Sequence, residues 1–328
     1  MSRRPVVGYY AHHHGRGHLT RAAAILGALD AEATVLSTGS YVGPGASIVL
    51  KDDAIEPGPH TRETAGGVLH WAPLRSAGLR DRMTAIASWI DAARPDAFVV
   101  DVSVEVAMLA RLCGVPTVVM AMPGERGDEP HQLGYAAADA IIASWPQALY
   151  EPSWLGAHTD RTTYVGGISR FEHRSPLTRP ASTERTVVVL GSRGGAGFSE
   201  SDIDAARAAT PGWRWVPIGT PGAVWAEDPW DLLCSADVIV SAAGQSSIAD
   251  LAVLGKPAIV LCEPRPYDEQ LATGRSLRDG GLATVLEKWP EPARWPALIA
   301  GATAGRWGAW ATAGAARRAA AVIERLTS

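Results

Sequence analysis

Short apolar runs rich in β-branched residues alternate with helical patterns along the whole chain. Runs that are apolar on both faces are typical of strands buried in a parallel sheet, and strand–helix alternation predicts right-handed crossovers. In the first half the predicted strands are Pro5–Tyr10, Thr34–Ser37, Phe98–Asp101, Thr117–Met120 and Ala140–Ala143, and the predicted helices are Leu19–Leu29, Leu79–Ala93 and Val104–Leu112.

The alternation stops at Ser169–Arg185, a polar stretch with two prolines that is typical of a linker. It then resumes with predicted strands Thr186–Leu190, Arg214–Ile218, Val238–Ser241 and Ala258–Leu261, and with predicted helices Ser199–Ala209, Gln245–Leu254 and Gly305–Leu326. The pattern predicts two doubly wound α/β domains, residues 1–168 and 169–305. Ligands of such sheets bind at the carboxyl ends of the strands, so we expect a cleft there.

Length, charge and cysteine content exclude several classes of protein. A chain of 328 residues is longer than one core usually serves. Its net charge of −4 provides no basic excess for a nucleic-acid backbone. Cys113, Cys234 and Cys262 are far apart and form no CxxC pair, which argues against a disulfide framework and against a zinc–thiolate site. No stretch reads as a signal peptide or a membrane span, so we expect a cytoplasmic protein, with attachment to a membrane surface left open.

The first candidate site is the loop HHHGRGH, which leaves the first predicted strand and enters a helix. Gly15 and Gly17 allow a tight turn, and His18 then lies at the helix start, where the helix dipole keeps an imidazole neutral and suited to act as a general base. Asp101 follows a buried strand and is a second candidate for deprotonating or orienting an acceptor. A glycine turn with solvated histidines, and a helix cap at Asp101 or Ser103, are the structural alternatives.

The second and third candidate sites lie in the other half. LGSRGGAGFS is a glycine-rich turn that matches neither the dinucleotide nor the Walker pattern, which disfavours a nicotinamide oxidoreductase and a P-loop ATPase. In the segment Asp237–Leu261 a buried strand leads through Gly244 into a helix that begins Gln-Ser-Ser. Such a helix start can hold a diphosphate, and Asp250 further along it can accept both hydroxyls of a ribose.

This segment resembles the donor-binding half of family 28 glycosyltransferases of the GT-B fold. The similarity covers most of Gly166–Gly281 and consists of an S-x-x-G-x-x-[ST] turn, an acidic residue, x4-G-x-P and an acidic-Gln pair. The family includes the transferase that adds N-acetylglucosamine to a lipid-linked muramyl pentapeptide. The resemblance implies two Rossmann-like domains that face each other across a cleft, with a C-terminal helix within 306–328 crossing back to the N-terminal domain.

The resemblance also implies roles for individual residues in binding the donor. The implied donor-binding residues are Arg170, Ser192, Ala226, Gly244, Gln245, Ser246, Asp250, Glu269 and Gln270. Within this set Arg170 and the start of the helix would bind the diphosphate, and Asp250 would bind the ribose. Glu269 and Gln270 would bind the transferred sugar. Ser192 would line the acceptor or phosphate side, and the backbone of Ala226 would contact uracil. Asp250 replaces the usual glutamate, and Glu269-Gln270 differs from the usual pair, so the sugar is left open.

We therefore expect a glycosyltransferase that is inverting and independent of metal and of any cofactor. Its donor would be a UDP-sugar, with UDP-N-acetylglucosamine as one candidate, and its acceptor a hydroxyl of a cell-envelope precursor or a secondary metabolite. Two alternatives remain at this point: a nucleotide-sugar hydrolase of the same fold, and a non-catalytic nucleotide-sugar-binding partner subunit.

Overall fold

The chain divides into two compact units in the computed structural model, which describes residues 3–12, 16–54, 61–175, 184–191, 198–223 and 225–327. The first unit comprises residues 1–144, 151–165 and 314–328, and the second comprises 145–150 and 166–313. Two candidate residues, Gly15 and Ser192, lie outside the described residues.

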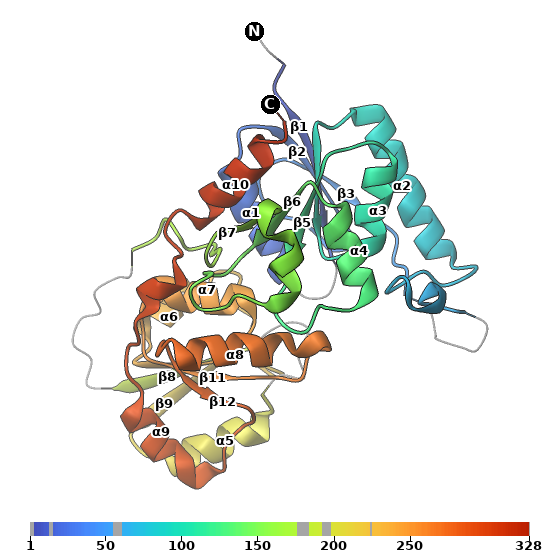
Figure 1. The fold of residues 1–328 in the computed structure, drawn as a ribbon. Coiled ribbons are helices and arrows are strands. Elements are labelled where there is room, and N and C mark those ends of the chain that lie inside the picture. The colour runs from blue at the N-terminus through green and yellow to red at the C-terminus, as the bar shows by residue number, and fades with distance from the viewer. Residues whose placement is uncertain are drawn as a thin grey trace. The chain divides into compact units, whose positions relative to one another are not determined.

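The described part of the first unit contains a parallel sheet of seven strands in the order β3-β2-β1-β4-β5-β6-β7 (Figure 1). Its strands are β1 (Val6–Ala11), β2 (Glu32–Ser37), β3 (Ala46–Val49), β4 (Ala97–Asp101), β5 (Thr117–Ala121), β6 (Ala140–Ala143) and β7 (Thr162–Tyr164). Its helices are α1 (Gly17–Gly27), α2 (Ala77–Ala93), α3 (Val104–Leu112), α4 (Glu129–Ala137) and α10 (Ala315–Glu324), with 3-10 turns η1 (Ala65–Gly67) and η2 (Ser153–Arg161).

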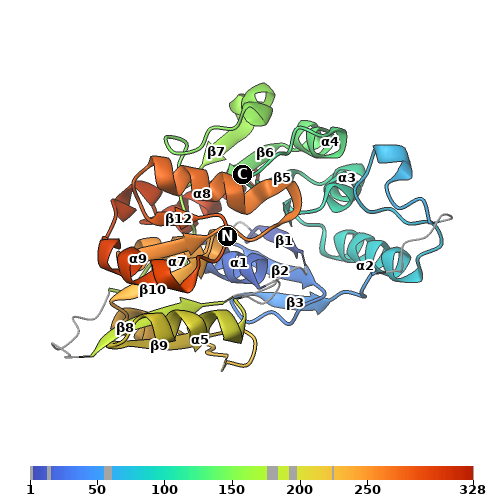
Figure 2. The same ribbon diagram turned by 90° about the horizontal axis from the view of Figure 1, so that it is seen from below.

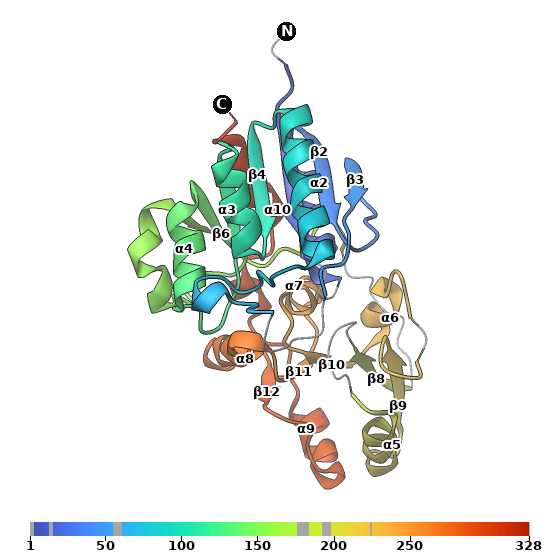
Figure 3. The same ribbon diagram turned by 90° about the vertical axis from the view of Figure 1, so that its right-hand side faces the viewer.

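Helices cover both faces of this sheet. The pair α1 and α10 packs on one face, and α2, α3 and α4 pack in a row on the other (Figure 3). All residues of β4, β5 and β6 are buried, which explains why their sequences are apolar without alternation. Serine side chains cap two of the helices: Ser76 accepts from the amide of Leu79 at 3.1 Å, and Ser103 accepts from the amide of Val106 at 3.2 Å.

The described part of the second unit contains a five-stranded parallel sheet in the order β12-β11-β10-β8-β9. Its strands are β8 (Arg185–Leu190), β9 (Trp213–Ile218), β10 (Val238–Ala242), β11 (Ala258–Leu261) and β12 (Thr284–Leu286). Its helices are α5 (Glu200–Ala209), α6 (Trp230–Ser235), α7 (Gln245–Leu254), α8 (Glu269–Asp279) and α9 (Trp295–Gly301), with 3-10 turns η3 (Pro266–Asp268), η4 (Pro292–Arg294) and η5 (Trp307–Trp310).

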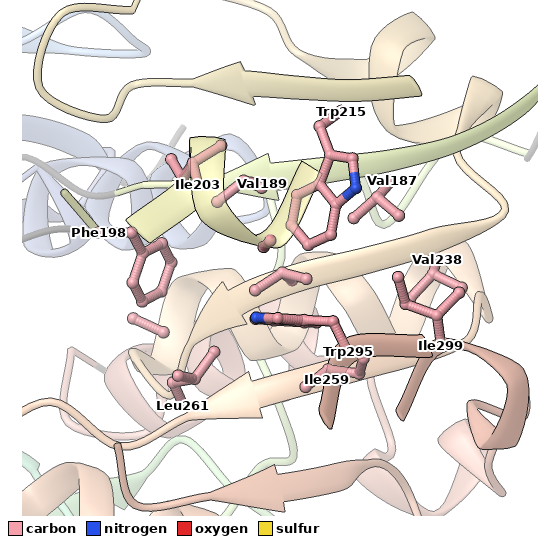
Figure 4. Packing of buried hydrophobic residues seen from close by; sticks show 13 residues of the cluster. Val187, Val189, Phe198, Ile203, Trp215, Val238, Ile259, Leu261, Trp295 and Ile299 are labelled. Carbon is pink, nitrogen blue, oxygen red and sulfur yellow. The ribbon is translucent and has the colours of Figure 1, made fainter. Parts of the chain in front are cut away.

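The core of the second unit is a layer of apolar side chains between its sheet and helices α5 and α9 (Figure 4). Phe198 precedes α5 and Ile203 lies within it, and this helix lies beside β8 and β9 in Figure 2. Trp295 of α9 is completely buried and meets Trp215 edge-on, with ring centroids 5.0 Å apart. The contact between Trp215 and Trp295 holds α9 on the face that α5 also covers, and α6, α7 and α8 occupy the other face (Figure 1).

The structure corrects the sequence interpretation in several elements. The long helix expected over Gly305–Leu326 is wrong in its first half: Trp307–Trp310 form a 3-10 turn, Ala311 and Gly314 have left-handed backbones, and α10 begins only at Ala315. Trp307 and Trp310 are both buried and belong to the second unit, whereas α10 belongs to the first, so the break falls where the chain passes from one unit to the other. The sequence interpretation also missed the short strands β3, β7 and β12.

Gly166 and Gly167 bring the chain close to η5. The amide of Gly167 donates to the carbonyl of Trp310 at 3.0 Å, and Gly166 has a left-handed backbone with φ of 80°. A Cβ atom on Gly167 would lie 2.3 Å from the Trp310 ring, far inside van der Waals contact. The two glycines therefore allow the close approach that places the following residues, Ser169 and Arg170.

We expect the Gly167→Ala variant to be destabilised by about 1 to 3 kcal/mol, because the added methyl group displaces a buried tryptophan. Gly308→Ala is the matched control, since a Cβ there would meet no atom within 4 Å. Urea unfolding followed by tryptophan fluorescence measures both. Equal midpoints for the two variants would show that the segment moves aside freely.

Candidate donor-binding and catalytic sites

The structure brings His18 and Asp101 together at the carboxyl ends of β1 and β4. Asp101 is the last residue of β4, and His18 is the second residue of α1. His18 Nδ1 lies 2.8 Å from Asp101 Oδ1. An ionised carboxylate only accepts hydrogen bonds, so the shorter contact places a proton on Nδ1, which also lies 3.1 Å from Arg21 Nη2, and in the neutral ring Nε2 then has the lone pair. This is the arrangement of a histidine base oriented by an aspartate.

Arg21 holds the Asp101 carboxylate, and sequence reasoning missed it. Its Nε donates to Asp101 Oδ2 at 2.9 Å and its Nη1 to Ser144 Oγ at 3.1 Å. The hydroxyl of Tyr9 donates to the same Oδ2 at 3.0 Å. The spacing His-x-x-Arg on a helix places His18 and Arg21 on one face, so a signal was present in the sequence.

These contacts fix the charge state of Asp101. Burial by itself raises the pKa of this fully buried carboxyl, but Arg21 and His18 reverse that effect and hold the pKa well below its usual range. Asp101 therefore stays ionised at ordinary pH and is a poor proton acceptor. The structure favours Asp101 as the residue that orients His18, and the helix cap of α3 is Ser103 rather than Asp101.

The start of α7 has a glycine, Gly244, as its N-cap residue, and this residue has no side chain that could cap the helix. The helix follows β10 directly, and its first turn contains no acidic residue. A Cβ on Gly244 would meet no atom within 4 Å, so there is open space at this point. Gln245 and Ser246 are half-buried in the first turn. The positive end of the helix dipole, equivalent to about half a charge, favours an anion here.

Asp250 and Arg170 lie together in the second unit, and Ser169 joins them. Ser169 Oγ donates to Asp250 Oδ1 at 2.7 Å, and Arg170 Nε donates to Asp250 Oδ2 at 3.1 Å. Burial raises the pKa of Asp250 to about 6, although Arg170 and Ser169 act in the opposite direction. Both residues were expected to contact a donor, and here they contact each other.

The start of α8 carries the two residues expected to hold the transferred sugar. Tyr267 and Asp268 precede it with left-handed φ angles of 60° and 54°, a conformation that costs non-glycine residues energy and recurs at functional sites. Glu269 is half-buried. Gln270 is buried, and its Oε1 accepts from the amides of Ala243 and Glu263 at 3.1 and 2.9 Å. Gln270 thus ties the ends of β10 and β11 to α8.

Ala226, expected to face uracil, lies half-buried in the loop between β9 and α6. Trp225 beside it packs against Gly219. Trp230 is a core residue, since its ring lies 4.9 Å from that of Phe171, centroid to centroid, and is 5 % exposed.

A histidine cluster in the first unit was not foreseen. Within the described ranges, His70, Asp128 and His131 place three ligand atoms within 4.8 Å of one another. His70 Nε2 donates to Asp128 Oδ2 at 2.7 Å, and His131 Nδ1 contacts Asp128 Oδ1. His70 lies in a loop far along the chain from Asp128 and His131, so no local sequence pattern predicts this cluster.

The chemistry of this cluster does not fit a metal ion. Arg126 Nη1 lies 2.8 Å from His131 Nε2, and a guanidinium can only donate, so Nε2 accepts and Nδ1 carries the proton. A metal on Nδ1 would need that proton removed and would lie near a buried cation. The groups instead satisfy each other as a hydrogen-bond chain from Arg126 to His131 and then to Asp128.

Comparison with known proteins defines the class. Residues 230–291 match the Glycosyltransferase family 28 C-terminal domain. Two solved structures cover the chain: the glycotransferase of kitacinnamycin, with a TM-score of 0.68 and 19% identity over 100% of both chains, and Acinetobacter baumannii MurG, with 0.62 and 15% over 98% and 100%. The chain therefore has the GT-B glycosyltransferase fold.

A curated relative is similar to about half of the chain. The UDP-N-acetylglucosamine--N-acetylmuramyl-(pentapeptide) pyrophosphoryl-undecaprenol N-acetylglucosamine transferase of Rubrobacter xylanophilus is 28% identical over 198 residues, which are 54% of this chain and 57% of that protein. The chain spans about half the length of the curated relatives it matches. Residues 230–291 thus resemble the C-terminal domain of family 28 glycosyltransferases, and the chain as a whole is similar in fold to solved GT-B structures.

The helices of the described chain give no membrane-spanning segment, because none is both long enough and apolar enough to cross a bilayer.

The buried His131 predicts a loss of stability in acid. Burial and the neighbouring Arg126 lower its pKa from 6.5 to about 4. Between these pH values the unfolded chain binds a proton at this residue that the folded chain does not bind. The free energy of unfolding is therefore highest above pH 6.5 and falls as the pH is lowered towards 4, by on the order of 3 kcal/mol.

We expect the His131→Asn variant to lose less stability than wild type between pH 7 and pH 4.5, since its amide can donate to Asp128 and does not titrate. Urea midpoints measured across this range test the expectation. Parallel pH profiles for the two proteins would contradict it.

Proposed function

We propose that this chain is an inverting, metal-independent glycosyltransferase that moves a sugar from a UDP-sugar to a hydroxyl acceptor. The observation that carries the proposal is the start of α7 at Gly244, which has open space beside it and no acidic residue in its first turn, and which lies inside the segment that matches the family 28 domain. A helix start of this kind offers amide donors and positive potential to the diphosphate of a nucleotide sugar.

Leaving-group stabilisation is the main task of the second unit in this proposal. As the bond between the anomeric carbon and the diphosphate oxygen breaks, negative charge grows on the diphosphate. The amides at Gln245 and Ser246 and the guanidinium of Arg170 stabilise that charge. They supply electrostatic stabilisation of the kind that other transferases obtain from a divalent metal ion.

In this proposal His18 activates the acceptor hydroxyl. Its Nε2 takes the proton of the acceptor hydroxyl while that oxygen attacks the anomeric carbon, and the imidazolium that forms is stabilised by ionised Asp101 at 2.8 Å. A single displacement of this kind inverts the configuration at the anomeric carbon. Asp101 orients the base and, with its low pKa, does not take the proton.

The remaining donor contacts are proposed from the resemblance. The backbone of Ala226 would contact uracil, and Glu269 and Gln270 would contact the sugar, with Gln270 limited to its amide nitrogen because its oxygen binds two backbone amides. N-acetylglucosamine is one candidate sugar, since the Rubrobacter relative is named for it. The acceptor would be a hydroxyl of a cell-envelope precursor or of a secondary metabolite.

Calorimetric titration with UDP-, dTDP-, GDP- and ADP-sugars tests the donor. We expect a UDP-sugar to bind most tightly, and Ser246→Asp to weaken it at least 100-fold because a carboxylate then occupies the helix start and repels the diphosphate. Thr303→Asp, an exposed hydroxyl-to-carboxylate change in the loop after α9, should leave affinity unchanged. Failure of wild type to bind any nucleotide sugar would overturn the proposal.

Removal of the base should separate chemistry from binding. We expect His18→Ala to lower sugar transfer 100-fold or more, while donor affinity stays within threefold of wild type, because general bases contribute about 10²–10⁴ in rate. Transfer onto a panel of hydroxyl acceptors, followed by mass spectrometry, measures the rate. Stoichiometric sugar release without acceptor would identify a hydrolase instead, and full cellular function of His18→Ala would identify a non-catalytic subunit.

A further inference from the structure

Both oxygens of the Asp250 carboxylate are already engaged by neighbouring side chains. Asp250 lies in the middle of α7 and is only 3 % exposed. One oxygen accepts from Ser169 Oγ at 2.7 Å and the other from Arg170 Nε at 3.1 Å. The side chain is also one methylene shorter than the glutamate that the resemblance places at the ribose. The Asp250 carboxylate is therefore poorly placed to contact a ligand.

Arg170 is held from its other side as well. Its guanidinium carbon lies 4.6 Å from the centroid of the Phe171 ring, which in turn packs on Trp230. The amide of Phe171 donates to Ser169 Oγ at 3.0 Å, so Ser169 links the backbone of this turn to Asp250. The carboxylate and the aromatic ring thus hold the guanidinium from two sides, and Ser169 holds the carboxylate.

The guanidinium of Arg170 remains partly accessible to solvent between Asp250 and Phe171. The Arg170 side chain is 33 % exposed, and among the described residues Asp250 is its one recorded hydrogen-bond acceptor. Because Asp250 uses the Nε–H group, four of the five N–H groups of the guanidinium lie beyond this carboxylate. Asp250 is five residues into α7, about 8 Å along the axis from the helix start.

We infer that Asp250 and Ser169 are positioning residues that hold Arg170 ready for the diphosphate, and that Asp250 does not bind the ribose. This inference rests on the proposed UDP-sugar donor and changes the task expected for Asp250. Turning the carboxylate towards a ribose would break both contacts, which would leave the buried Ser169 hydroxyl without its acceptor and Arg170 without its partner carboxylate. An arginine that is already oriented loses less conformational entropy when the diphosphate binds.

A ligand without the ribose diol separates the two roles. Affinities for UDP and for 2′,3′-dideoxyuridine diphosphate are measured by calorimetry on wild type and on Asp250→Asn. Asparagine can keep its oxygen on Ser169 while its NH₂ group faces Arg170 and cannot accept from it. We expect about a tenfold loss of affinity, equal for both ligands. A loss confined to UDP would show that Asp250 contacts the diol and would overturn the inference.

A double-mutant cycle tests whether the effect passes through Arg170. In an Arg170→Gln background, Asp250→Asn should change UDP affinity less than twofold, because the residue it positions is gone. An undiminished tenfold loss in that background would contradict the inference. If wild type binds neither diphosphate, the proposed donor itself is wrong, so the two failures are distinguishable.

Ser169→Ala repeats the test without altering charge, in case Asp250→Asn does not fold. We expect a threefold or larger loss, equal for both ligands and abolished by Arg170→Gln. Ser276→Ala is the matched control: this buried hydroxyl of α8 donates to the carbonyl of Ala272 at 3.0 Å, and its removal should not alter affinity. Wild-type affinity in Ser169→Ala would show that the serine does not position the arginine.

Discussion

The ion pair between Arg21 and Asp101 is the interaction on which the first unit depends. A carboxylate with no solvent exposure is tolerated only when its charge is compensated, and Arg21 supplies that compensation through two of its nitrogens. The pair joins α1 to β4, and the bond to Ser144 extends it to the chain just beyond β6. Loss of either partner would leave a buried charge, at a cost of about 3 to 5 kcal/mol. The orientation of His18 thus follows from a requirement of folding.

The second unit uses the same pair of residue types with a different outcome. Arg21 is 5 % exposed and is fully used inside the protein, whereas Arg170 touches Asp250 through one nitrogen and stays 33 % exposed. The first pair therefore serves a neighbouring imidazole. The second leaves a cation accessible to an anion from solution. Burial of the arginine, rather than its presence, distinguishes a structural pair from one suited to ligand binding.

The sequence predicted the layout of both units well because buried parallel strands are apolar on both faces. The helix Gln245–Leu254 and the strand Ala258–Leu261 have the predicted bounds, and His18 lies at a helix start as expected. Short edge strands such as β12 carry too few residues to show a pattern. The partners of Asp101 and Asp250 depend on contacts between segments some 80 residues apart, which no local spacing encodes. Arg21 was the exception, since its spacing from His18 was visible.

The return of α10 to the first unit means that this unit is assembled from separated stretches of chain, with Gly166–Ala313 running between them. Arg318 of α10 donates to the carbonyl of Val165, the last residue before that intervening stretch. Most of the second unit is thus an insertion in the sequence of the first unit, and a hydrogen bond joins the two segments of the first unit that flank it. An exchange of the second unit between two chains of this fold would accordingly require two junctions, one near residue 165 and one near residue 314. A chimaera with a single junction near residue 165 would combine the terminal helix of one parent with the rest of the first unit from the other.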